Sequence, residues 1–500
     1  MKTCFVLVLL LSAVVLPGQD KHDYVWLLGY PPNSEQDSLG GTLLDFNARP
    51  PAAIFFETPY GLGQSAAVCD HDGNLAFYTN GCDIRNRYHQ QMQNGEGINA
   101  GQMQGFYCFD GNGTYPNHQG VLALPYPGLE GRYALFHLRM DDFAFSIDQL
   151  MYSVIDAEAD AGHGAVLQKN VLLLQTSLAD QLTGVRHANG RDWWIVVPQQ
   201  LGNRYYIFLF SPEGVVGPWM QNIGHSWAIA SRRGQACFSP DGSKYVRTDP
   251  YNGIQLFDFD RCAGVLSNHV AVGLLPHHFG YEWHGLSISP NSRFLYMSYP
   301  TLLLQYDLHA ANIAASVRYI ALYDGSFSPQ RTNFYQHTLG PNGKIYITAH
   351  NSVNCLHVIH RPDELGVACD FEQRGLRLPS QHALAAPNIP HFRLWGEAGS
   401  PCDTLGLTGP VAAPEERRPP FDIRLFPNPA GEQAILLLEG APPGPAWMGL
   451  YNAMGQLVRQ ASWPQAGRHE ISLAGLPAGV YYAQIATADG QRRVLPLAKR

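Results

Sequence analysis

The stretch GQACFSPDGSKYV, residues 234–246, decides the fold of this 500-residue chain. It consists of a short apolar strand, a Ser-Pro-Asp-Gly turn and a second strand that begins at Lys244. An Asp-Gly pair between apolar strands is a strong signal of a β-hairpin, because glycine accepts the positive φ that such turns require. The stretch therefore predicts a hairpin.

Related hairpins recur along the chain at a nearly constant interval. The closest copies are GLSISPNSRFLYMS (residues 285–298) and HTLGPNGKIYITA (residues 337–349). Looser copies span residues 66–79, 120–138, 184–197 and 383–395. A repeat of roughly fifty residues is typical of the four-stranded blades of a β-propeller. The repeat therefore predicts about seven blades, with six or eight left open.

The two ends of the repeat are each incomplete. The last copy, residues 383–395, has no strand after it, and two strands at residues 23–30 and 41–47 precede the first copy. Joining these ends closes a ring, which removes the exposed sheet edges of an open stack. The sequence therefore predicts an all-β fold, with a propeller over residues 23–398.

Composition supports this fold class and excludes one class of partner. Glycine (50), proline (36), tyrosine (25) and phenylalanine (23) are abundant, and only 15% of residues are charged. This balance favours strands and turns over helices. The net charge of −8, without a basic stretch, gives no electrostatic footprint for nucleic acid. We therefore expect no nucleic-acid partner.

The N-terminus has the pattern of a secretory signal peptide. Lys2 is followed by an apolar run over residues 5–16 and by Leu-Pro-Gly at residues 16–18. The run is too short to span a membrane, and no other stretch approaches eighteen apolar residues. We expect residues 1–18 to be a signal peptide and the exported chain to have no membrane span.

Eight cysteines remain once Cys4 is assigned to the signal peptide. In an exported protein they can form disulfides, and the pairs closest in sequence are Cys355 with Cys369 and Cys237 with Cys262. Free buried thiols are the equal alternative. The chain has no Cys-x-x-Cys pair, so a zinc ribbon or a thioredoxin-like site is not supported.

The composition changes after the propeller. Residues 399–420 are proline-rich and lack strand periodicity, which indicates a linker. Residues 421–500 then predict seven short strands with regular turns, which is typical of a small β-sandwich. The predicted strands cover residues 423–426, 434–439, 448–451, 457–460, 469–473, 480–485 and 493–497.

This last segment resembles the C-terminal sorting domain (type A) of the type IX secretion system of Bacteroidota. The matching motifs are LFPNPA (residues 425–430), LYNAMGQLV (450–458) and LPAGVYYAQI (476–485), with a basic end at Lys499-Arg500. The resemblance implies that the type IX machinery is a partner and that the protein is secreted or displayed on the outer cell surface. It also implies that the domain is usually cleaved after export. The alternative is an immunoglobulin-like adhesion module that stays attached.

The preceding part resembles secreted proteins of the same bacteria that carry a YVTN/WD40-like propeller before a sorting domain. The motifs are GNLAFYTNGCDIRNRYHQQM (residues 73–92), HANGRDWW (187–194) and HVIHRPDELGVACDF (357–371), together with the SPDG and GPNG turns. The resemblance covers most of residues 23–395 and implies no assigned reaction.

Four histidines stand just before or at the start of predicted inner strands. They are His118, His284, His337 and His382. In a propeller such positions lie near the central channel, where imidazoles from different blades could converge on a ligand or an ion. Glu, Asp and Asn do not recur at equivalent positions, so a polar lining without a metal is favoured. We predict no metal and no cofactor.

Two other motifs have a structural explanation that we favour. Asp70-x-Asp72-Gly73-Asn74 imitates the start of a calcium loop, but Gly81 stands where an EF-hand needs glutamate, so a tight turn is preferred. His187 with residues 191–194 suggests a triad or a sugar platform, yet strand alternation turns one tryptophan into the core.

These observations favour an extracellular binding or interaction module whose partner is a protein or a glycan. No nucleophile elbow, His-Glu-x-x-His or phosphate loop is present, and no catalytic residue is assigned. A non-enzymatic role is therefore favoured. The alternatives are a secreted hydrolase or lyase that acts on a lactone or glycan in the channel, and a structural component of the surface or gliding apparatus.

Overall fold

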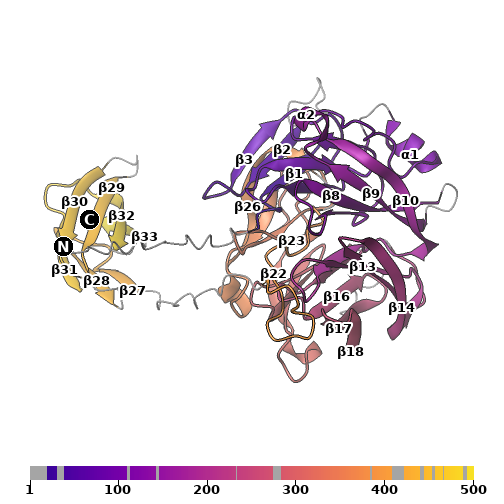
Figure 1. Cartoon of the computed structure of the whole chain (residues 1–500). Coiled ribbons are helices and arrows are strands. Elements are labelled where there is room, and N and C mark those ends of the chain that lie inside the picture. The colour runs from indigo at the N-terminus through magenta and orange to yellow at the C-terminus, as the bar shows by residue number, and fades with distance from the viewer. Residues whose placement is uncertain are drawn as a thin grey trace, which may run out of the picture. The chain divides into compact units, whose positions relative to one another are not determined.

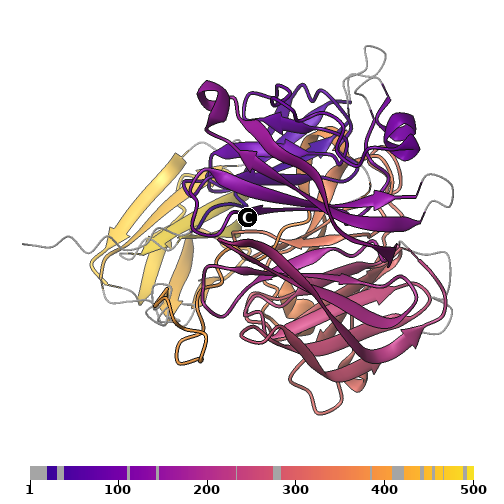
Figure 2. The same ribbon diagram turned by 45° about the vertical axis from the view of Figure 1, so that its right-hand side comes forward.

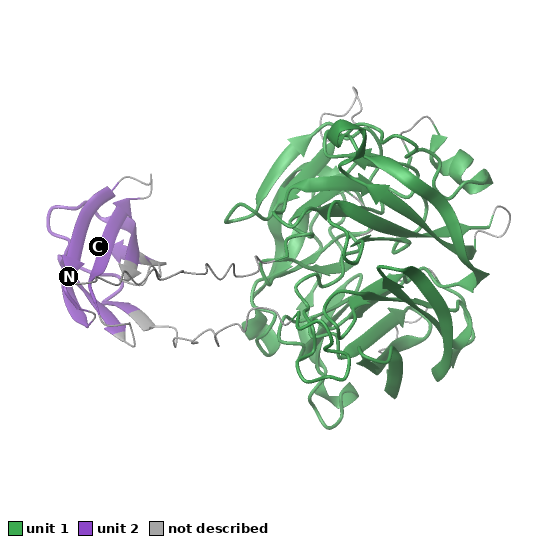
Figure 3. Cartoon of the chain, viewed as in Figure 1, with its two compact units in different colours: residues 1–410 green, residues 411–500 purple. Residues whose placement is uncertain are grey.

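The computed structural model divides the chain into two compact units, Met1–Pro410 and Val411–Arg500 (Figure 3). The described residues are 20–407, except 31–38, 110–112, 142–145, 232, 274–282, 383 and 385, and 422–500, except 440–443, 453–456, 466 and 488–491. The predicted signal peptide, residues 1–18, and most of the predicted linker lie outside the described residues.

The first unit contains seven antiparallel sheets, each a meander of consecutive strands (Figures 1 and 2). We number them blades 1 to 7 in chain order. Blade 1 has β1 (Val25–Gly29), β2 (Gly41–Asp45) and β3 (Ala52–Phe56). Blade 2 has β4 (Ala66–Cys69), β5 (Leu75–Thr79) and β6 (Ile84–Asn86). Blade 3 has β7 (Val121–Pro125), β8 (Arg132–Met140), β9 (Ile147–Asp156) and β10 (Ala165–Leu178).

Blades 4 to 7 have four strands each. Blade 4 has β11 (Thr183–Arg186), β12 (Trp193–Pro198), β13 (Gly202–Ser211) and β14 (Gly214–Trp227). Blade 5 has β15 (Gln235–Phe238), β16 (Lys244–Asp249), β17 (Gly253–Asp260) and β18 (Val265–Val272). Blade 6 has β19 (Gly285–Ile288), β20 (Phe294–Tyr299), β21 (Leu302–Asp307) and β22 (Arg318–Leu322). Blade 7 has β23 (His337–Leu339), β24 (Ile345–Ile347), β25 (Val353–Ile359) and β26 (Phe371–His382).

Helices are short in the described part of the chain. They are α1 (Gln102–Tyr107), α2 (Ala159–Gly162) and the 3-10 turns η2 (Ala314–Ser316) and η3 (Gly366–Cys369).

The hairpin at residues 234–246 forms as predicted, between β15 and β16. Gly242 has a φ of 74°, in the left-handed region that glycine tolerates. The Asp241 carboxylate accepts hydrogen bonds from the Ser243 amide (3.0 Å) and the Ser239 hydroxyl (2.5 Å). The five earlier and later copies between residues 66 and 349 form the corresponding hairpins of blades 2, 3, 4, 6 and 7. The turn residues in the sequence therefore identified where these hairpins and their inner strands form.

The sheets form a ring because each packs its apolar face on the next. Trp194 and Val196 of blade 4 share a buried cluster with Phe238 and Tyr245 of blade 5. The inner strands β11, β15, β19 and β23 lie side by side in that order, as do β1, β4 and β7. The fold is an all-β, seven-bladed propeller.

The ring closes where blade 7 meets blade 1. Trp26 and Leu44 of blade 1 belong to one buried cluster with Tyr346 of blade 7. The Trp26 and Tyr346 rings meet edge to face, 5.5 Å apart. The hydroxyls of Thr42 in β2 and Ser380 in β26 are hydrogen-bonded at 2.8 Å. Side-chain packing thus joins the two ends of the ring.

The hairpin predicted over residues 383–395 does not form. None of its described residues belongs to a strand. Pro387 and Pro390 lack the amide hydrogen that a β-ladder requires, which is the physical reason. The N-terminal strands therefore form the separate sheet β1-β2-β3 instead of sharing a ladder with the C-terminal segment.

Residues 386–395, which we call the channel segment, take the place of an innermost strand in blade 1. On one side, Thr338 of blade 7 donates a hydrogen bond to the Pro387 carbonyl (3.3 Å). On the other, the Asn388 amide donates to the carbonyl of Ser65, just before β4 of blade 2 (3.3 Å). The two ends of the propeller therefore meet, although no ladder joins them.

Both predicted disulfides are wrong: the bonded pairs are Cys82–Cys108 and Cys262–Cys402. Cys355 lies opposite Arg377 in the β25–β26 ladder, whereas Cys369 precedes the point where Phe371 pairs with Ile359. Four residues of strand span about 13 Å, which exceeds the Cα separation of a disulfide. Closeness in sequence does not give closeness across a ladder.

The second wrong pair fails for a related reason. Cys237 lies in β15 and pairs with Val246 of β16. Cys262 lies beyond the end of β17, in the turn toward the outer strand, and bonds to Cys402, which follows the channel segment. Among the described residues the free cysteines are Cys69, Cys237, Cys355 and Cys369, so the alternative of free thiols is the one that holds for Cys237, Cys355 and Cys369.

The second unit is a sandwich of two sheets. One sheet contains β27 (Asp422–Phe426), β28 (Gln433–Glu439) and β31 (Arg468–Ser472). The other contains β29 (Ala446–Asn452), β30 (Leu457–Trp463), β32 (Gly479–Thr487) and β33 (Arg492–Lys499). Leu436 and Ile471 from the first sheet share a core with Met448, Ile485 and Leu497 from the second. All seven predicted strands form.

Candidate functional site

Glutamines bridge backbone groups of different blades around the propeller channel. Gln119 pairs with the peptide groups of Ala236, donating to its carbonyl (2.7 Å) and accepting from its amide (2.9 Å). Gln235 donates to the His337 carbonyl (2.7 Å) and accepts from the amides of His337 and Leu286, at 3.0 Å each. These hydrogen bonds satisfy backbone N–H and C=O groups of the inner strands, which have no further strand beside them to pair with.

Sequence analysis overlooked these glutamines. A glutamine stands shortly before or at the start of the inner strand in five blades, as Gln64, Gln119, Gln181, Gln235 and Gln336. Aligning the hairpin copies a few residues upstream would have revealed this signal.

The channel segment completes this network. The Asn388 side chain donates to the carbonyls of Val121 and Leu182, both at 2.8 Å, and accepts from Gln119 (3.2 Å). Gln336 accepts from the Ala386 amide (3.0 Å). The cavity left between the inner strands and the channel segment is about 50 Å³. It has room for a water or two, but not for a sugar or a lactone.

The four predicted channel histidines do not gather at one point. His118 borders an open pocket at the channel mouth. His284 is completely buried, with its ring 4.6 Å from that of Tyr299. His337 lies between blades, where Nε2 is 2.9 Å from the Ser298 hydroxyl. His382 contacts the Cys355 carbonyl through Nε2 (3.0 Å).

Burial sets the charge state of two of these rings. It lowers the pKa of His337 to about 3, with the nearby His357 contributing, and that of His382 to about 4. Both rings are therefore neutral near pH 7. Among the described residues, no group of three or more His, Cys, Asp or Glu side chains could hold a metal ion.

The two other sequence motifs have structural roles. Asp70 accepts hydrogen bonds from the amides of Asp72 (3.0 Å) and Asn74 (2.9 Å), which makes a tight turn. Trp193 and Trp194 are 0% and 5% exposed, so neither presents a face for a sugar ring. The tight turn forms as expected, and both tryptophans are buried where one was expected.

An open pocket lies at the end of the channel where most inner strands begin, and we call it the mouth pocket. Its volume is about 570 Å³, within the usual range for small-molecule sites. Loops and turns from several blades converge on it. Its lining includes His118, Gln200, Arg233, Tyr251, Trp283 and His350, with Leu384 beside the channel segment.

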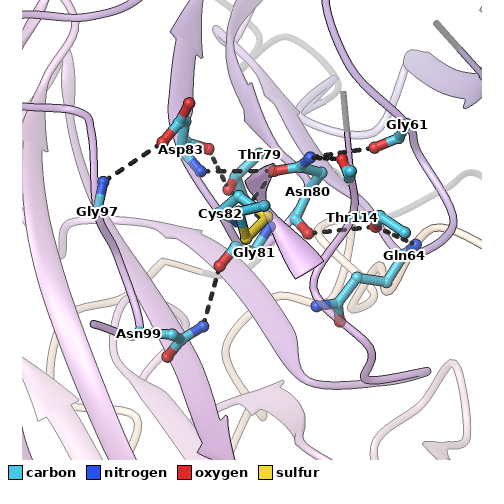
Figure 4. Close-up of a disulfide and its surroundings, with 12 residues drawn as sticks. Gly61, Gln64, Thr79, Asn80, Gly81, Cys82, Asp83, Gly97, Asn99 and Thr114 are labelled. Atoms are coloured by element: carbon cyan, nitrogen blue, oxygen red, sulfur yellow. Dashed lines mark hydrogen bonds between the residues drawn. A yellow bond between two sulfur atoms is a disulfide. The ribbon is translucent and has the colours of Figure 1, made fainter. Parts of the chain in front are cut away.

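One wall of the mouth pocket is formed by Tyr107 and residues 114–118, and a disulfide lies next to Tyr107 in the chain. Cys108 is bonded to Cys82, which follows β5 (Figure 4). Asn80 donates to the carbonyls of Gly61 (3.1 Å) and Gly113 (2.8 Å) and accepts from the Cys82 amide (2.9 Å). Cys108 and Gly113 are therefore held to blade 2 by a covalent bond and a hydrogen bond.

Aromatic side chains form another part of the wall. The Trp283 ring stacks on His350, with centroids 3.7 Å apart, and the Arg233 guanidinium lies 5.0 Å from the indole centroid. Next to this stack, the Tyr335 hydroxyl is 2.8 Å from Nδ1 of His118. Such stacking limits the freedom of the arginine side chain.

A second open groove, of about 750 Å³, lies at the hairpin turns of blades 2, 3 and 4. Its charged side chains are engaged with one another or with neighbours. Arg186 pairs with Asp20 (2.9 Å) and Arg87 with Glu158 (2.8 Å). In the described lining of the mouth pocket, Arg233 is the only Lys or Arg, and no Asp or Glu appears there.

The C-terminal unit matches a known family. Residues 424–494 match the secretion system C-terminal sorting domain. The comparison with curated proteins found no relative. Among the described residues, no helix is long and apolar enough to cross a membrane.

Solved structures resemble the first unit at low identity. A protein of Bacteroides fragilis, assigned provisionally as a 6-phosphogluconolactonase, is 10% identical with a TM-score of 0.40, over 73% of this chain and 98% of that one. The Dos1 propeller is 12% identical with a TM-score of 0.34, over 66% and 91%. The β-propeller domain of Swd1 from Myceliophteria thermophila is 9% identical with a TM-score of 0.36, over 65% and 92%. The protein is a β-propeller that carries a secretion system C-terminal sorting domain at its end.

Proposed function

We propose that this protein is an extracellular binding module, exported through the type IX secretion system, whose ligand occupies the mouth pocket. The observation that carries the proposal is the contrast between the two spaces on the propeller axis. The channel retains only about 50 Å³, whereas the mouth pocket offers about 570 Å³. A ligand of sugar or peptide size fits only the second space.

The filled channel weighs against a hydrolase or lyase that works inside it. Such an enzyme needs space for substrate beside its catalytic groups, and Asn388 with the glutamines occupies that space. The polar side-chain atoms in the channel form hydrogen bonds between blades. The rigid ring instead holds the loops of the mouth pocket in fixed positions, which favours recognition.

Binding by the full chain to a glycan array and to extracellular proteins tests this proposal. Trp283→Ala should abolish the binding seen with the wild type, since the indole forms one wall of the mouth pocket. Trp219→Ala is the matched control, because that tryptophan is 47% exposed on outer strand β14. Turnover of a lactone or glycan by the wild type would favour the enzymatic alternative.

The export part has a separate test. Deleting residues 421–500 removes the sorting domain and should leave the propeller in the periplasm, as fractionation and immunoblotting would show. Normal surface delivery of the truncated protein would refute this part. A truncated protein that is degraded would call for a fusion of residues 421–500 to a reporter, which should then be exported.

A further inference from the structure

A disulfide holds the C-terminal end of the propeller to blade 5. Residues 396–407, which we call the strap, follow the channel segment directly. Cys402 in the strap is bonded to Cys262, which lies in the turn between β17 and β18. The two cysteines are 140 positions apart, so the bond is a tertiary link and not part of a local turn.

The other polar contacts of the strap hold it mainly to itself. Most hydrogen bonds of the strap join two of its own residues. The Gly396 amide donates to the Leu407 carbonyl (3.0 Å), which closes the strap into a loop. Toward the propeller, the Glu397 amide donates to the carbonyl of Ala188 in blade 4 (2.8 Å). A loop that satisfies its own backbone can leave a surface at low cost, so the disulfide supplies much of the attachment.

The strap nevertheless has one defined position on blade 4. Gly190, in the turn between β11 and β12, has a φ of 78°. A Cβ atom at this residue would lie 2.6 Å from the Gly396 nitrogen and 2.8 Å from the Leu407 carbonyl oxygen. Only glycine lets the backbone of the strap approach so closely. The strap therefore lies at the hairpin-turn end of blades 4 and 5.

The two disulfides of the propeller differ in their access to solvent. Cys262 lines an open pocket of about 520 Å³, and Cys402 is half-buried. Cys82 is 3% exposed and belongs to a buried apolar cluster, against which Cys108 packs. Thiol–disulfide exchange requires an attacking thiolate to reach a sulfur atom. The Cys262–Cys402 bond is therefore the one that is open to exchange in the folded protein.

We propose that the Cys262–Cys402 disulfide is a redox latch, which fixes the strap on the propeller after export and releases it on reduction. Formation of the bond removes two protons and two electrons from the two thiols. The acceptor is the disulfide of an oxidising protein in the compartment that exported chains enter. One cysteine thiolate attacks this disulfide and forms a mixed disulfide, and the other thiolate then displaces the oxidant's remaining sulfur. The oxidant leaves as two thiols, so the exchange is balanced.

The latch determines where the chain leaves the propeller. With the bond formed, the chain beyond Leu407 starts from a fixed point on blades 4 and 5. With the bond reduced, it starts from the channel segment, which has its own attachments. Arg393 pairs with Asp23, and Arg261 donates to the Trp395 carbonyl. Reduction should therefore release the strap and leave the ring closed.

Selective reduction of the full, oxidised chain tests the latch. The folded protein is treated with increasing dithiothreitol, quenched with an alkylating reagent and mapped by mass spectrometry. We expect the Cys262–Cys402 bond to be reduced at least about tenfold faster than the Cys82–Cys108 bond. Tryptophan fluorescence should stay that of the folded protein. Reduction of Cys262–Cys402 only together with unfolding of the propeller would overturn the proposal.

Hydrogen exchange then measures the release itself. Exchange at the amides of Gly396 and Glu397, which are hydrogen-bonded in the oxidised protein, should rise by about tenfold or more on reduction. Unchanged exchange would overturn the proposal, because it would show that the hydrogen bonds hold the strap without the disulfide.

Two double variants separate release of the strap from general loss of stability. Cys262→Ser with Cys402→Ser should show the fast exchange of the strap without any reductant. Cys82→Ser with Cys108→Ser is the matched control and should keep the slow exchange. Equally fast exchange of the strap in both variants would contradict a specific latch. If either variant does not fold, the selectively reduced wild type decides.

Discussion

Arg393 donates hydrogen bonds to both carboxylate oxygens of Asp23, at 2.5 and 2.8 Å, and so joins the end of the channel segment to a residue two positions before β1. The two residues are 370 positions apart in the chain. The Asp23 side chain is 2% exposed and that of Arg393 is 22% exposed. With the packing of blade 7 on blade 1, this pair completes the ring.

Breaking this pair should destabilise the propeller. Arg393→Met leaves a buried carboxylate without its partner, which costs about 3–5 kcal/mol in the free energy of unfolding. Urea unfolding followed by tryptophan fluorescence measures the loss. Arg293→Gln is the control, because Arg293 is 46% exposed and its pair with Asp307 lies at the surface. Equal effects of the two substitutions would contradict the role of the Arg393–Asp23 pair.

Asn388 should be equally sensitive, and for a different reason. In Asn388→Asp the side chain keeps its size but loses the two hydrogen-bond donors that face the carbonyls of Val121 and Leu182. Each buried carbonyl left without a donor costs about 1–3 kcal/mol. We expect a lower urea midpoint, whereas Asn222→Asp, on exposed strand β14, should leave it nearly unchanged. A stable Asn388→Asp protein would show that the channel segment is dispensable for ring closure.

Local signals in the sequence predicted most of the propeller, and non-local contacts explain what they missed. Asp241 and Gly242 determine a turn within a few residues, so the hairpin at β15–β16 could be predicted from them alone. The conformation of the channel segment could not, because its hydrogen bonds go to other blades.

The mouth pocket likewise has features that the sequence indicates and features that it does not. His118 could be placed near the channel because it precedes an inner strand. The stack of Trp283 on His350 joins the loop before blade 6 to a turn of blade 7, and no spacing in the sequence indicates it. The disulfides were missed because ladder register, and not closeness in sequence, decides which cysteines meet.

Stability should fall when the solution is acidified below about pH 6.5. Burial lowers the pKa of His137 to about 3. Nδ1 of this ring lies 2.7 Å from Oδ1 of Asn99, and Nε2 lies 3.1 Å from the Ser153 hydroxyl. His337 and His357 behave alike, each with a pKa of about 3. The unfolded chain takes up protons on these rings near pH 6.5 and the folded chain does not, so stability is complete above that pH and declines as the pH falls toward 3.

Thermal midpoints measured from pH 7 to pH 4 test whether stability falls on acidification and whether the buried histidines cause the fall. Each such histidine adds up to about 1.4 kcal/mol per pH unit to the slope. His137→Gln should reduce the slope of stability against pH by the contribution of one histidine. This holds even if the substitution lowers the thermal midpoint at pH 7. His71→Gln is the control variant, because that side chain is 63% exposed. A midpoint independent of pH would contradict the buried neutral state.

Thiol labelling should distinguish the two classes of cysteine. Burial raises the pKa of Cys237 to about 12 and that of Cys355 to about 11, so these thiols stay protonated and unreactive in the folded protein. Without residues 1–18, unfolding without reductant should expose four thiols, and adding reductant should expose eight. Peptide mapping should recover Cys82–Cys108 and Cys262–Cys402, and a different pairing would contradict the structure.

Lys499 should be required for the sorting domain, through its fold. Its side chain is 4% exposed, and Nζ donates to the carbonyls of Leu473 (2.8 Å) and Leu476 (2.7 Å), with Glu432 at 3.2 Å. Lys499→Met keeps the aliphatic length but leaves both carbonyls without this donor, so the domain should lose stability and export should fall. Fractionation of cells measures the exported share. Arg500→Gln, at the exposed next position, is the matched control and should be exported normally; equal loss in both variants would show that terminal charge, and not the fold around Lys499, is what matters.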